Sequence, residues 1–348
     1  MEHFFKKDDI ELFFKRIKNS VNILIVTHTN PDGDAIGSVT AMGRFLSNLG
    51  KSYSIWTPNR YPDYLSFMDP LLEIKTYEKD KDLLPLIIQK TDLIICMDFN
   101  QLKRVDDLEL IIKNSKAYKI LVDHHPEPES ENFDLVFSDS AVSSTCECFY
   151  WVLDSVIEIH PEYSSFFDKS VANSLYAGLM TDTNNFANSV RPYTFIVAAH
   201  LIEKGVDKEN MQHKIFGVFS EGRMRLLGHA LLNKMRVLPE LEAAYIVLTK
   251  EELDYYKFRE GDSEGFVNMP LNINNINISA LFTESDEYVR VSLRSVNDFS
   301  VNKLSRAFFN GAGHERAAGG RFFMPIEDVG RFFEYKLKLF IEGNINGN

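Results

Sequence analysis

The sequence predicts an α/β protein: a doubly wound, mainly parallel sheet domain, a helical bridge and a smaller mixed α/β C-terminal domain. Three observations support this prediction. Apolar runs typical of buried strands alternate with helical patterns in the first half of the chain. Polar groups follow three of these runs directly, at the point where a strand would end. The chain has 348 residues, more than one hydrophobic core usually serves, so we expect two domains.

The first domain is expected over residues 1–190. Residues 1–18 mix apolar and charged side chains at helical spacing, as in an amphipathic helix. Three apolar runs predict buried strands: 21–26, 93–97 and 119–122. The other elements expected here are a strand at 53–56 and helices at 35–49, 144–156 and 169–180. Ser143-Ser144-Thr145 predicts the N-cap of the second of these helices.

The second half divides into a bridge and a cap domain. Residues 191–238 have an almost wholly helical pattern and are expected to link two lobes. Pro239 marks a break, after which we expect a substrate-binding cap domain over 239–348. Its expected strands lie at 243–248, 278–282 and 288–293, and its expected helices at 301–308 and 326–340.

Composition indicates an ordinary globular protein. Apolar residues make up 45% and charged residues 25%, which argues against long disordered segments. The N-terminus does not resemble a signal peptide, and no apolar run is long enough to span a membrane, so we expect a cytoplasmic protein without a membrane partner. Three cysteines, Cys96, Cys146 and Cys148, fit no zinc-binding spacing and are expected to fill the core.

The net charge of −12 argues against binding of long duplex nucleic acid. The charge is uneven, however. Between Arg290 and Lys338 nine basic residues stand against five acids. This local surplus is either a chance fluctuation or a small cationic surface that holds an anionic substrate.

Acids and histidines gather at the predicted strand ends. They occur as His28-Thr-Asn-Pro-Asp32-Gly-Asp34, Asp98, Asp123-His124-His125 and Asp182. Ligands of open parallel sheets bind beyond the carboxyl ends of the strands, so residues distant in sequence can meet there. Carboxylates packed together without a cation would repel one another. The joint pattern therefore predicts a site for two metal ions, whereas any single Asp could instead be a helix cap or turn residue.

The donor types indicate which metal would bind. Imidazole and carboxylate without thiolate suit a hard or borderline divalent ion, so manganese or magnesium is favoured over a structural zinc. Asp98 is placed to bridge two ions that would clamp a phosphoryl group and lower the pKa of a bridging water. The adjacent His124 and His125 project differently, so one can bind metal while the other meets the substrate; the alternative is a capping or core histidine.

These groups resemble the successive motifs of the DHH phosphoesterase superfamily. Residues 28–38, Asp98, 123–125 and 181–183 match its catalytic domain. Residues 291–295, 301–304 and 311–320 resemble its associated C-terminal domain, with Ala312 where the family commonly has glycine. Within the superfamily the pattern is similar to the NrnA-like group of bifunctional oligoribonucleases and phosphoadenosine-phosphate phosphatases.

The resemblance implies a role for each matching residue. His28, Asp32 and Asp98 would hold one metal, and Asp34, Asp98, His124 and Asp182 the second. Asp98, Asp123 and His125 would form the catalytic group, in which His125 contacts the scissile phosphate or protonates the leaving group and Asp123 orients the site. The substrate would be held by residues of the cap domain, namely Arg294, Ser295, Gly311, Gly313 and His314. The implied cofactor is two divalent ions, usually Mn²⁺, with Mg²⁺ or Co²⁺ as alternatives.

The function expected from the resemblance is metal-dependent hydrolysis of short single-stranded oligonucleotides to mononucleotides. Dephosphorylation of 3′-phosphoadenosine 5′-phosphate to AMP is a second expected activity of the same site, and a homodimer is left open. Arg104 and Arg191 are further candidates to reach phosphate, although exposed arginines usually have only solvated or ion-paired roles. Three alternatives remain: an inorganic pyrophosphatase or exopolyphosphatase, a linear or cyclic dinucleotide phosphodiesterase, and a nucleotide-binding sensor without turnover.

Overall fold

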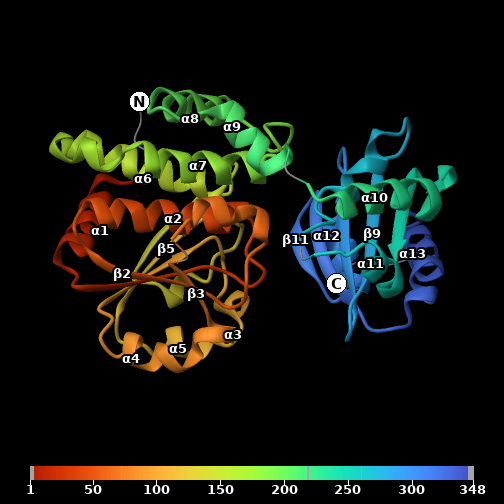
Figure 1. The fold of residues 1–348 in the computed structure, drawn as a ribbon, viewed down its shortest axis with the longest axis horizontal. Coiled ribbons are helices and arrows are strands. Elements are labelled where there is room, and N and C mark those ends of the chain that lie inside the picture. Colours follow the sequence, from red (N-terminus) through yellow and green to blue (C-terminus); the bar gives the residue numbers. More distant parts are fainter. Residues whose placement is uncertain (1–3, 72, 218, 260, 344–348) are drawn as a thin grey trace. The chain divides into compact units, whose positions relative to one another are not determined.

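The computed structural model describes residues 4–71, 73–217, 219–259 and 261–343. The chain forms two compact units, Met1–Val218 and Phe219–Asn348, which we call unit 1 and unit 2 (Figure 1). The predicted N-terminal helix is observed as α1 (Lys7–Asn19), and the 1–3 part of that prediction lies outside the described residues. No helix in the described ranges combines the length and apolar character that crossing a membrane requires.

Unit 1 contains a six-stranded sheet in which every neighbouring pair of strands is parallel. The strands lie in the order β3 (Ile74–Thr76), β2 (Ser52–Thr57), β1 (Asn22–Val26), β4 (Leu93–Met97), β5 (Tyr118–Asp123) and β6 (Leu135–Ser138). The chain moves outward from β1 in one direction and from β4 in the other. The carboxyl ends of β1 and β4 therefore mark the topological switch point, where such sheets bind ligands.

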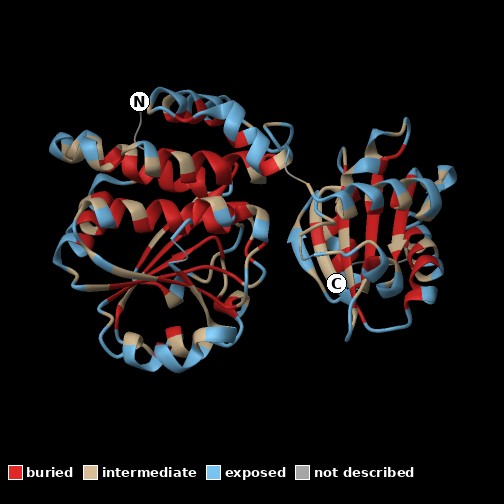
Figure 2. Ribbon diagram, in the orientation of Figure 1, coloured by how far each residue is buried: buried red, intermediate tan, exposed pale blue. Residues whose placement is uncertain are grey.

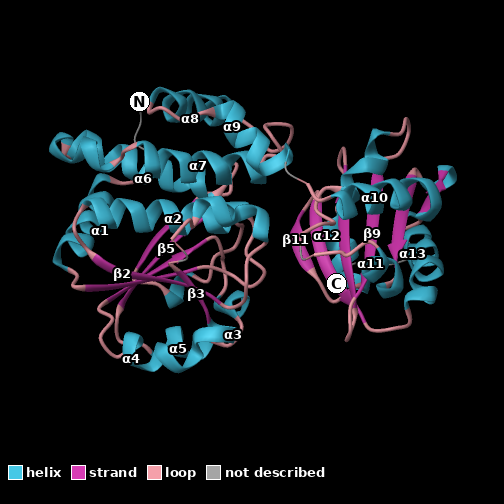
Figure 3. Ribbon diagram, in the orientation of Figure 1, coloured by secondary structure: helices cyan, strands magenta, loops and turns pink. Residues whose placement is uncertain are grey.

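Helices cover both faces of this sheet (Figure 3). One face carries α1, α2 (Gly33–Asn48), α6 (Thr145–Ile159) and α7 (Lys169–Asp182), and the other carries α4 (Leu84–Ile88) and α5 (Leu108–Asn114), with α3 (Tyr77–Asp80) before α4. Side chains of β1 alternate between two cores: Ile23 and Ile25 pack on the first face, Leu24 and Val26 on the second. The strands are therefore buried on both sides (Figure 2), as parallel strands usually are.

The helical segment predicted over residues 191–238 is divided between the units. Helices α8 (Pro192–Glu203) and α9 (Lys208–Gln212), with a π-helical turn at His213–Gly217, belong to unit 1. Helix α10 (Glu221–His229) and a second π-helical turn at Ala230–Lys234 belong to unit 2. The last four residues form β7 (Met235–Leu238) instead of helix, because they pair antiparallel with β8 (Ala243–Leu248).

Unit 2 contains a mixed six-stranded sheet with helices on both faces, which agrees with the smaller mixed α/β domain that the sequence predicts. Its order is β11 (Ala312–His314), β12 (Ala317–Phe322), β10 (Val289–Ser295), β9 (Ile278–Glu284), β8 and β7. Only the β8–β9 pair is parallel. One face packs on α12 (Val301–Phe308) and α13 (Ile326–Ile341), and the other on α10, α11 (Lys250–Tyr255) and a 3₁₀ segment at Phe266–Asn272.

The glycine-rich segment of unit 2 forms the β11–β12 hairpin. A Cβ at Gly311 would lie 1.9 Å from the carbonyl oxygen of Gly319, so a side chain has no room there. Ala312, by contrast, is exposed in β11 and does not have a positive φ. Alanine at this position is therefore compatible with the hairpin.

Candidate metal centre

Asp98 lies at the centre of the candidate site. It follows β4 directly, its backbone adopts a φ of 67°, and its amide donates to the carbonyl oxygen of Val122 in the neighbouring strand. A positive φ is uncommon for a non-glycine residue and marks a specific turn. This turn keeps the side chain, which is only 3% exposed, among residues that follow β1 and β5.

The first possible ligand group consists of His28, Asp32 and Asp98, whose ligand atoms lie within 4.8 Å of one another. The Nε2 atom of His28 is 3.3 Å from Oδ2 of Asp98, and its Nδ1 is 2.8 Å from the carbonyl oxygen of Thr29. A proton on Nδ1 would donate to that carbonyl and leave the Nε2 lone pair for a metal. Asp32 caps α2 through Oδ1, which accepts from the amides of Asp34 and Ala35.

The capping role of Asp32 does not exclude a ligand role. Both amide contacts use the same oxygen, Oδ1, whereas a carboxylate has two oxygens that can accept or coordinate. The two interpretations of this residue that the sequence allows are therefore compatible.

The second group consists of Asp34, Asp98 and His124, again within 4.8 Å of one another. The Nε2 atom of His124 is 3.8 Å from Oδ1 of Asp98 and 3.7 Å from Oδ2 of Asp182. The structure thus brings together all six residues predicted as metal ligands. We call them the strand-end cluster: His28, Asp32, Asp34, Asp98, His124 and Asp182.

The start of α6 orients two carboxylates of this cluster, those of Asp34 and Asp98. The sequence analysis did not predict these contacts. Both oxygens of Asp34 accept backbone amides, from Thr145 at 2.6 Å and from Cys146 at 2.9 Å. The hydroxyl of Thr145 also donates to Oδ1 of Asp98 at 2.9 Å. Ser144 is the N-cap of α6, as predicted, because its hydroxyl accepts the amide of Glu147. The N-cap motif was the available signal for this helix end, but its contact with Asp34 depends on tertiary packing.

Close packing of α7 completes the surroundings of Asp34. A Cβ at Gly178 would lie 2.3 Å from Sγ of Cys146 and 2.9 Å from Oδ1 of Asp34. Only glycine therefore lets α7 approach this closely. The three cysteines, including Cys146, are buried and unpaired, which confirms the prediction that they fill the core.

A third group contains Asp98, Asp123 and His125. The Nδ1 atom of His125 is 2.8 Å from Oδ1 of Asp123, and its Nε2 is 2.9 Å from a guanidinium nitrogen of Arg104. The Arg104 group can only donate, so Nε2 accepts from it and Nδ1 carries a proton toward Asp123. The other oxygen of Asp123 is buried and has no hydrogen-bond partner among the described residues. Arg104, predicted as a phosphate contact, thus reaches the catalytic candidate His125 itself.

The electrostatics of the strand-end cluster indicate a shortage of positive charge. Burial raises the pKa of Asp34 well above its ordinary value, and Asp98, Asp182 and Asp32 raise it further. Burial alone would also raise the pKa of Asp98, but His28, His125 and His124 hold it well below the usual range.

The pKa values of the histidines are shifted by the same excess of negative charge. Burial by itself would lower the pKa of both His28 and His124. Asp98 outweighs this effect at His28, and Asp182 with Asp98 does so at His124, so both pKa values are raised. Both shifts show that the two rings lie among more negative charge than the cluster itself offsets. The nitrogen and oxygen donors and the excess of carboxylates therefore fit divalent metal ions.

Comparison with known proteins identifies the family. Residues 22–179 match the DHH family N-terminal domain, and residues 244–332 match the DHHA1 domain. The chain also resembles the solved structure of an exopolyphosphatase-related protein from Bacteroides fragilis, with a TM-score of 0.89, 37% identity and 96% of each chain covered. The chain belongs to the DHH family. This confirms the family and the two-domain fold class predicted from the sequence.

Several relatives of this chain are named NrnA. The probable bifunctional oligoribonuclease and PAP phosphatase NrnA of Streptococcus mutans is 25% identical, over 92% of this chain and 96% of its own length. The bifunctional oligoribonuclease and PAP phosphatase NrnA of Bacillus subtilis is 27% identical, over 85% of this chain and 88% of its own length.

The substrate residues predicted in the DHHA1 domain lie in and beside the β10–β12–β11 region. Arg294 of β10 is in register with Ala317 of β12, which is in register with His314 of β11, so Arg294 and His314 share one row of the sheet. Ser295 is buried, and its hydroxyl donates to the carbonyl oxygen of Phe299 at 2.6 Å. Gly313, with a φ of 152°, lies against Ala317 and Ala318 within the hairpin.

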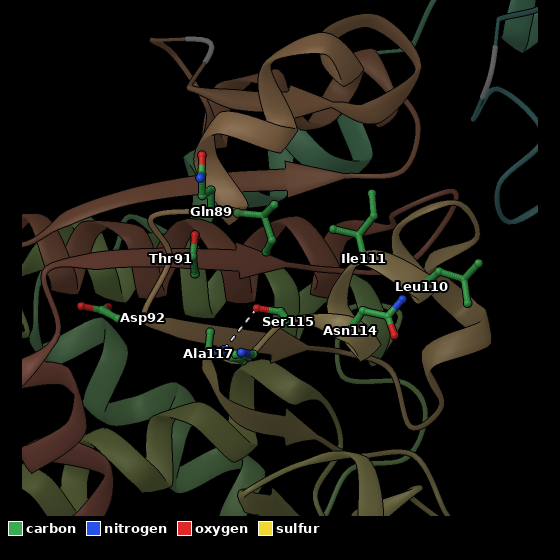
Figure 4. A pocket seen from close by; sticks show the side chains of 10 residues that line it. Gln89, Thr91, Asp92, Leu110, Ile111, Asn114, Ser115 and Ala117 are labelled. Carbon is green, nitrogen blue, oxygen red and sulfur yellow. Dashed lines mark hydrogen bonds between the residues drawn. The ribbon is translucent and has the colours of Figure 1, made fainter.

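The DHH domain also has a cavity of about 700 Å³ away from the strand-end cluster. Its lining residues come from the segments before β4 and β5, so it lies at the amino ends of the strands (Figure 4). They are Ile88, Gln89, Thr91, Asp92, Leu110, Ile111, Asn114, Ser115, Lys116 and Ala117. Asp92, the acid that lines it, accepts the amides of Val21 and Asn22. The cavity thus lies at the opposite edge of the sheet from the candidate metal centre.

Proposed function

We propose that this DHH protein is a metal-dependent phosphoesterase that hydrolyses short oligoribonucleotides to mononucleotides and dephosphorylates 3′-phosphoadenosine 5′-phosphate to AMP. The observation that carries the proposal is the position of Asp98, which belongs both to the His28–Asp32 ligand group and to the Asp34–His124 ligand group. The names of the NrnA relatives, which cover most of this chain, support these substrates.

In this proposal His28, Asp32 and Asp98 hold one divalent ion, and Asp34, Asp98, His124 and Asp182 hold the other. Mn²⁺ is the first choice, with Mg²⁺ or Co²⁺ as alternatives. Such ions supply positive charge that stabilises a phosphoryl group and lowers the pKa of water. The amides of Thr145 and Cys146 keep Asp34 oriented, and the Thr145 hydroxyl orients Asp98. Orientation by such supporting contacts is a general requirement of metal sites.

His125 acts on the substrate side of the same site. Asp123 keeps the proton on Nδ1 of His125, so that Nε2 is the atom that contacts the phosphate or exchanges a proton with the leaving oxygen. Arg104, which donates to Nε2 in this structure, is a guanidinium close enough to move onto a phosphate oxygen when substrate binds. Arg294 and His314 contact the terminal phosphate or nucleotide.

The test is a direct comparison of substrates with the wild-type protein in Mn²⁺ and in Mg²⁺. A diribonucleotide and 3′-phosphoadenosine 5′-phosphate are incubated beside pyrophosphate and polyphosphate, and the products are separated by chromatography. We expect mononucleotides and AMP. Hydrolysis of pyrophosphate or polyphosphate alone would reject the proposal.

The second candidate is an exopolyphosphatase or pyrophosphatase. It is favoured by one observation, the 37% identity to a protein described as exopolyphosphatase-related. The same assay separates the two candidates, because polyphosphate carries no base or sugar for the cap domain to bind.

A further inference from the structure

The turn between β4 and α5 carries Arg104 and is tied to the loop that follows β1. The amide of Thr29 donates to the carbonyl oxygen of Arg104 at 2.8 Å, and the hydroxyl of Thr29 donates to Oδ2 of Asp106 at 2.9 Å. Thr29 and Asp106 are 77 residues apart in the sequence. We call residues 101–106 the Arg104 turn.

The loop that follows β5 also holds the Arg104 turn. Oε2 of Glu129 accepts the amide of Leu102 at 3.2 Å, and the amide of Glu129 donates to the carbonyl oxygen of Asn100 at 2.8 Å. The side chains of Leu102 and Val105 are buried in the core beneath α4 and α5. The main chain of the turn is therefore fixed by both neighbouring loops and by the core, while the side chain of Arg104 is only half-buried.

Asp106 has a backbone conformation that usually requires glycine. Its φ is 42° and its ψ is −120°, angles close to those of the first central residue of a type II′ turn. Glu242 also has a positive φ, but its φ of 48° and ψ of 37° lie in the left-handed region that other residues can adopt. The conformation of Asp106 costs free energy and persists only where surrounding contacts require it. The backbone alone therefore favours glycine over aspartate at this position.

The side chain of Asp106 gives a reason for aspartate. The residue is exposed, so burial of its side chain does not explain its presence. Its carbonyl oxygen accepts the amide of Glu109, a contact that any residue could make. The hydrogen bond from Thr29, by contrast, requires a side chain with an acceptor oxygen.

Thr29 connects the Arg104 turn to the candidate metal centre. Its carbonyl oxygen is the partner of Nδ1 of the ligand candidate His28, while its amide and hydroxyl contact the turn. One residue therefore helps to set the position of Arg104 relative to a metal ligand. A side chain that is already in place when its ligand arrives loses less conformational entropy on binding.

We propose that Asp106 is a positioning residue, which uses its hydrogen bond to Thr29 to keep the Arg104 turn where Arg104 can reach a phosphate oxygen at the metal centre. The inference rests on the proposed function for the role of Arg104, and it extends that function to two residues that do not contact the substrate. The unfavourable backbone conformation of Asp106 is then retained because it serves the site.

The test measures binding of AMP, the product of the proposed reaction, to the full chain in Mn²⁺ by isothermal titration calorimetry. Asp106→Ala and Thr29→Val should each bind AMP about fivefold more weakly, as expected for the loss of one hydrogen bond. Asp106→Asn keeps an acceptor oxygen and should bind AMP as the wild-type protein does. Asp107→Ala is the matched control, because it removes the neighbouring exposed carboxylate, which does not cap α5, and it should also bind normally.

A double-mutant cycle decides whether Asp106 acts through Arg104. Arg104→Gln should weaken AMP binding about tenfold, since a hydrogen bond from a charged group is lost. Asp106→Ala should then have no further effect, because the group that it positions is absent. An equal loss from Asp106→Ala with and without Arg104 would overturn the inference. So would weak binding by Asp106→Asn, or a wild-type protein that does not bind AMP.

Stability provides a second readout, which separates positioning from a purely structural role. Asp106→Gly relieves the backbone and should melt about 3 °C above Asp106→Ala, yet it should bind AMP as weakly as Asp106→Ala does. An AMP affinity that follows stability would overturn the inference. Hydrolysis of a diribonucleotide by the wild-type protein is measured separately. The expected binding pattern without hydrolysis would count against the proposed function while supporting the role of Asp106.

Discussion

Each unit contains carboxylates that are shielded from solvent. In unit 2 the protein supplies the positive counter-charge, whereas in unit 1 the carboxylates outnumber the positive groups. In unit 2, Glu252 accepts the amide of Thr249 at 3.0 Å, Nζ of Lys234 at 2.9 Å and Nε2 of His229 at 2.9 Å. Burial alone would raise the pKa of Glu252, but these partners lower it to about 2. In unit 1, four carboxylates share two histidines within the strand-end cluster, and the pKa of Asp34 is raised.

The comparison teaches that a carboxylate shielded from solvent, whether partly like Glu252 or fully like Asp34, does not by itself identify a metal site. Glu252 has its counter-charge supplied by the protein, so it stabilises the fold and has no need of an added ion. The strand-end cluster lacks such a balance, since it contains four carboxylates and two histidines and no lysine or arginine. A site of this kind is stabilised when a divalent cation binds the carboxylates.

Among the variants that test this contrast, Asp98→Asn is expected to lose the most activity. The change preserves shape but removes the carboxylate common to both ligand groups. Loss of residues that only support metal ligands costs 10–100-fold, so hydrolysis of a dinucleotide in Mn²⁺ should fall by more than about 100-fold. Glu252→Gln is the control and should retain wild-type turnover. Activity of Asp98→Asn close to that of wild type would show that Asp98 is not central.

The strand-end cluster of unit 1 could be predicted from the sequence, whereas the surroundings of Glu252 in unit 2 could not. The strands before Asp98 and Asp123 are continuous apolar runs, and the polar residues that follow them could be placed at one sheet edge because parallel topology requires it. The strand at Leu93–Met97 and the helix at Val301–Phe308 have the predicted bounds.

The remainder depended on contacts that no local pattern records. The amides of Thr145 and Cys146 reach Asp34 across more than a hundred residues, and a sequence motif shows only that a helix begins there. Residues 235–238 have a short pattern that continues the preceding helical one, and only their pairing with β8 makes them a strand. Tertiary pairing thus overrode local propensity.

A second comparison of the units concerns metal-linked stability. Mn²⁺ at about one hundred times its dissociation constant should stabilise the protein by about 2.7 kcal/mol, because it binds only the folded site. For a domain of this size each kcal/mol corresponds to about 2–4 °C, so the melting temperature should rise by about 5–10 °C. Differential scanning fluorimetry measures the shift.

Asp34→Asn should diminish this rise, because it removes one carboxylate of the second ligand group. Glu252→Gln should leave the rise intact. An equal rise for wild type and Asp34→Asn would place the ion elsewhere.

The pH dependence of Glu252 provides the next test. Its folded pKa, about 2, lies below the ordinary value of 4.5, so its stabilisation is complete above pH 4.5 and is lost as the pH falls toward 2. At pH 7, Glu252→Gln should lower the free energy of unfolding of unit 2 by about 2 kcal/mol, since charged hydrogen bonds are lost. Urea denaturation should show this difference shrinking below pH 4.5. A difference independent of pH would mean that packing, not charge, is responsible.

The smallest effect is expected for Thr145→Val, which tests the support of the metal site without touching a ligand. The variant loses the 2.9 Å hydrogen bond from the Thr145 hydroxyl to Asp98, but keeps the backbone amide that binds Asp34. Turnover in saturating Mn²⁺ should fall about tenfold, the lower end for residues that orient metal ligands. The Mn²⁺ concentration needed for half-maximal activity should rise with it, whereas Thr145→Ser, which keeps the hydroxyl, should restore both quantities. If Thr145→Val kept the turnover and the Mn²⁺ requirement of the wild-type protein, orientation of Asp98 by this hydroxyl would be ruled out.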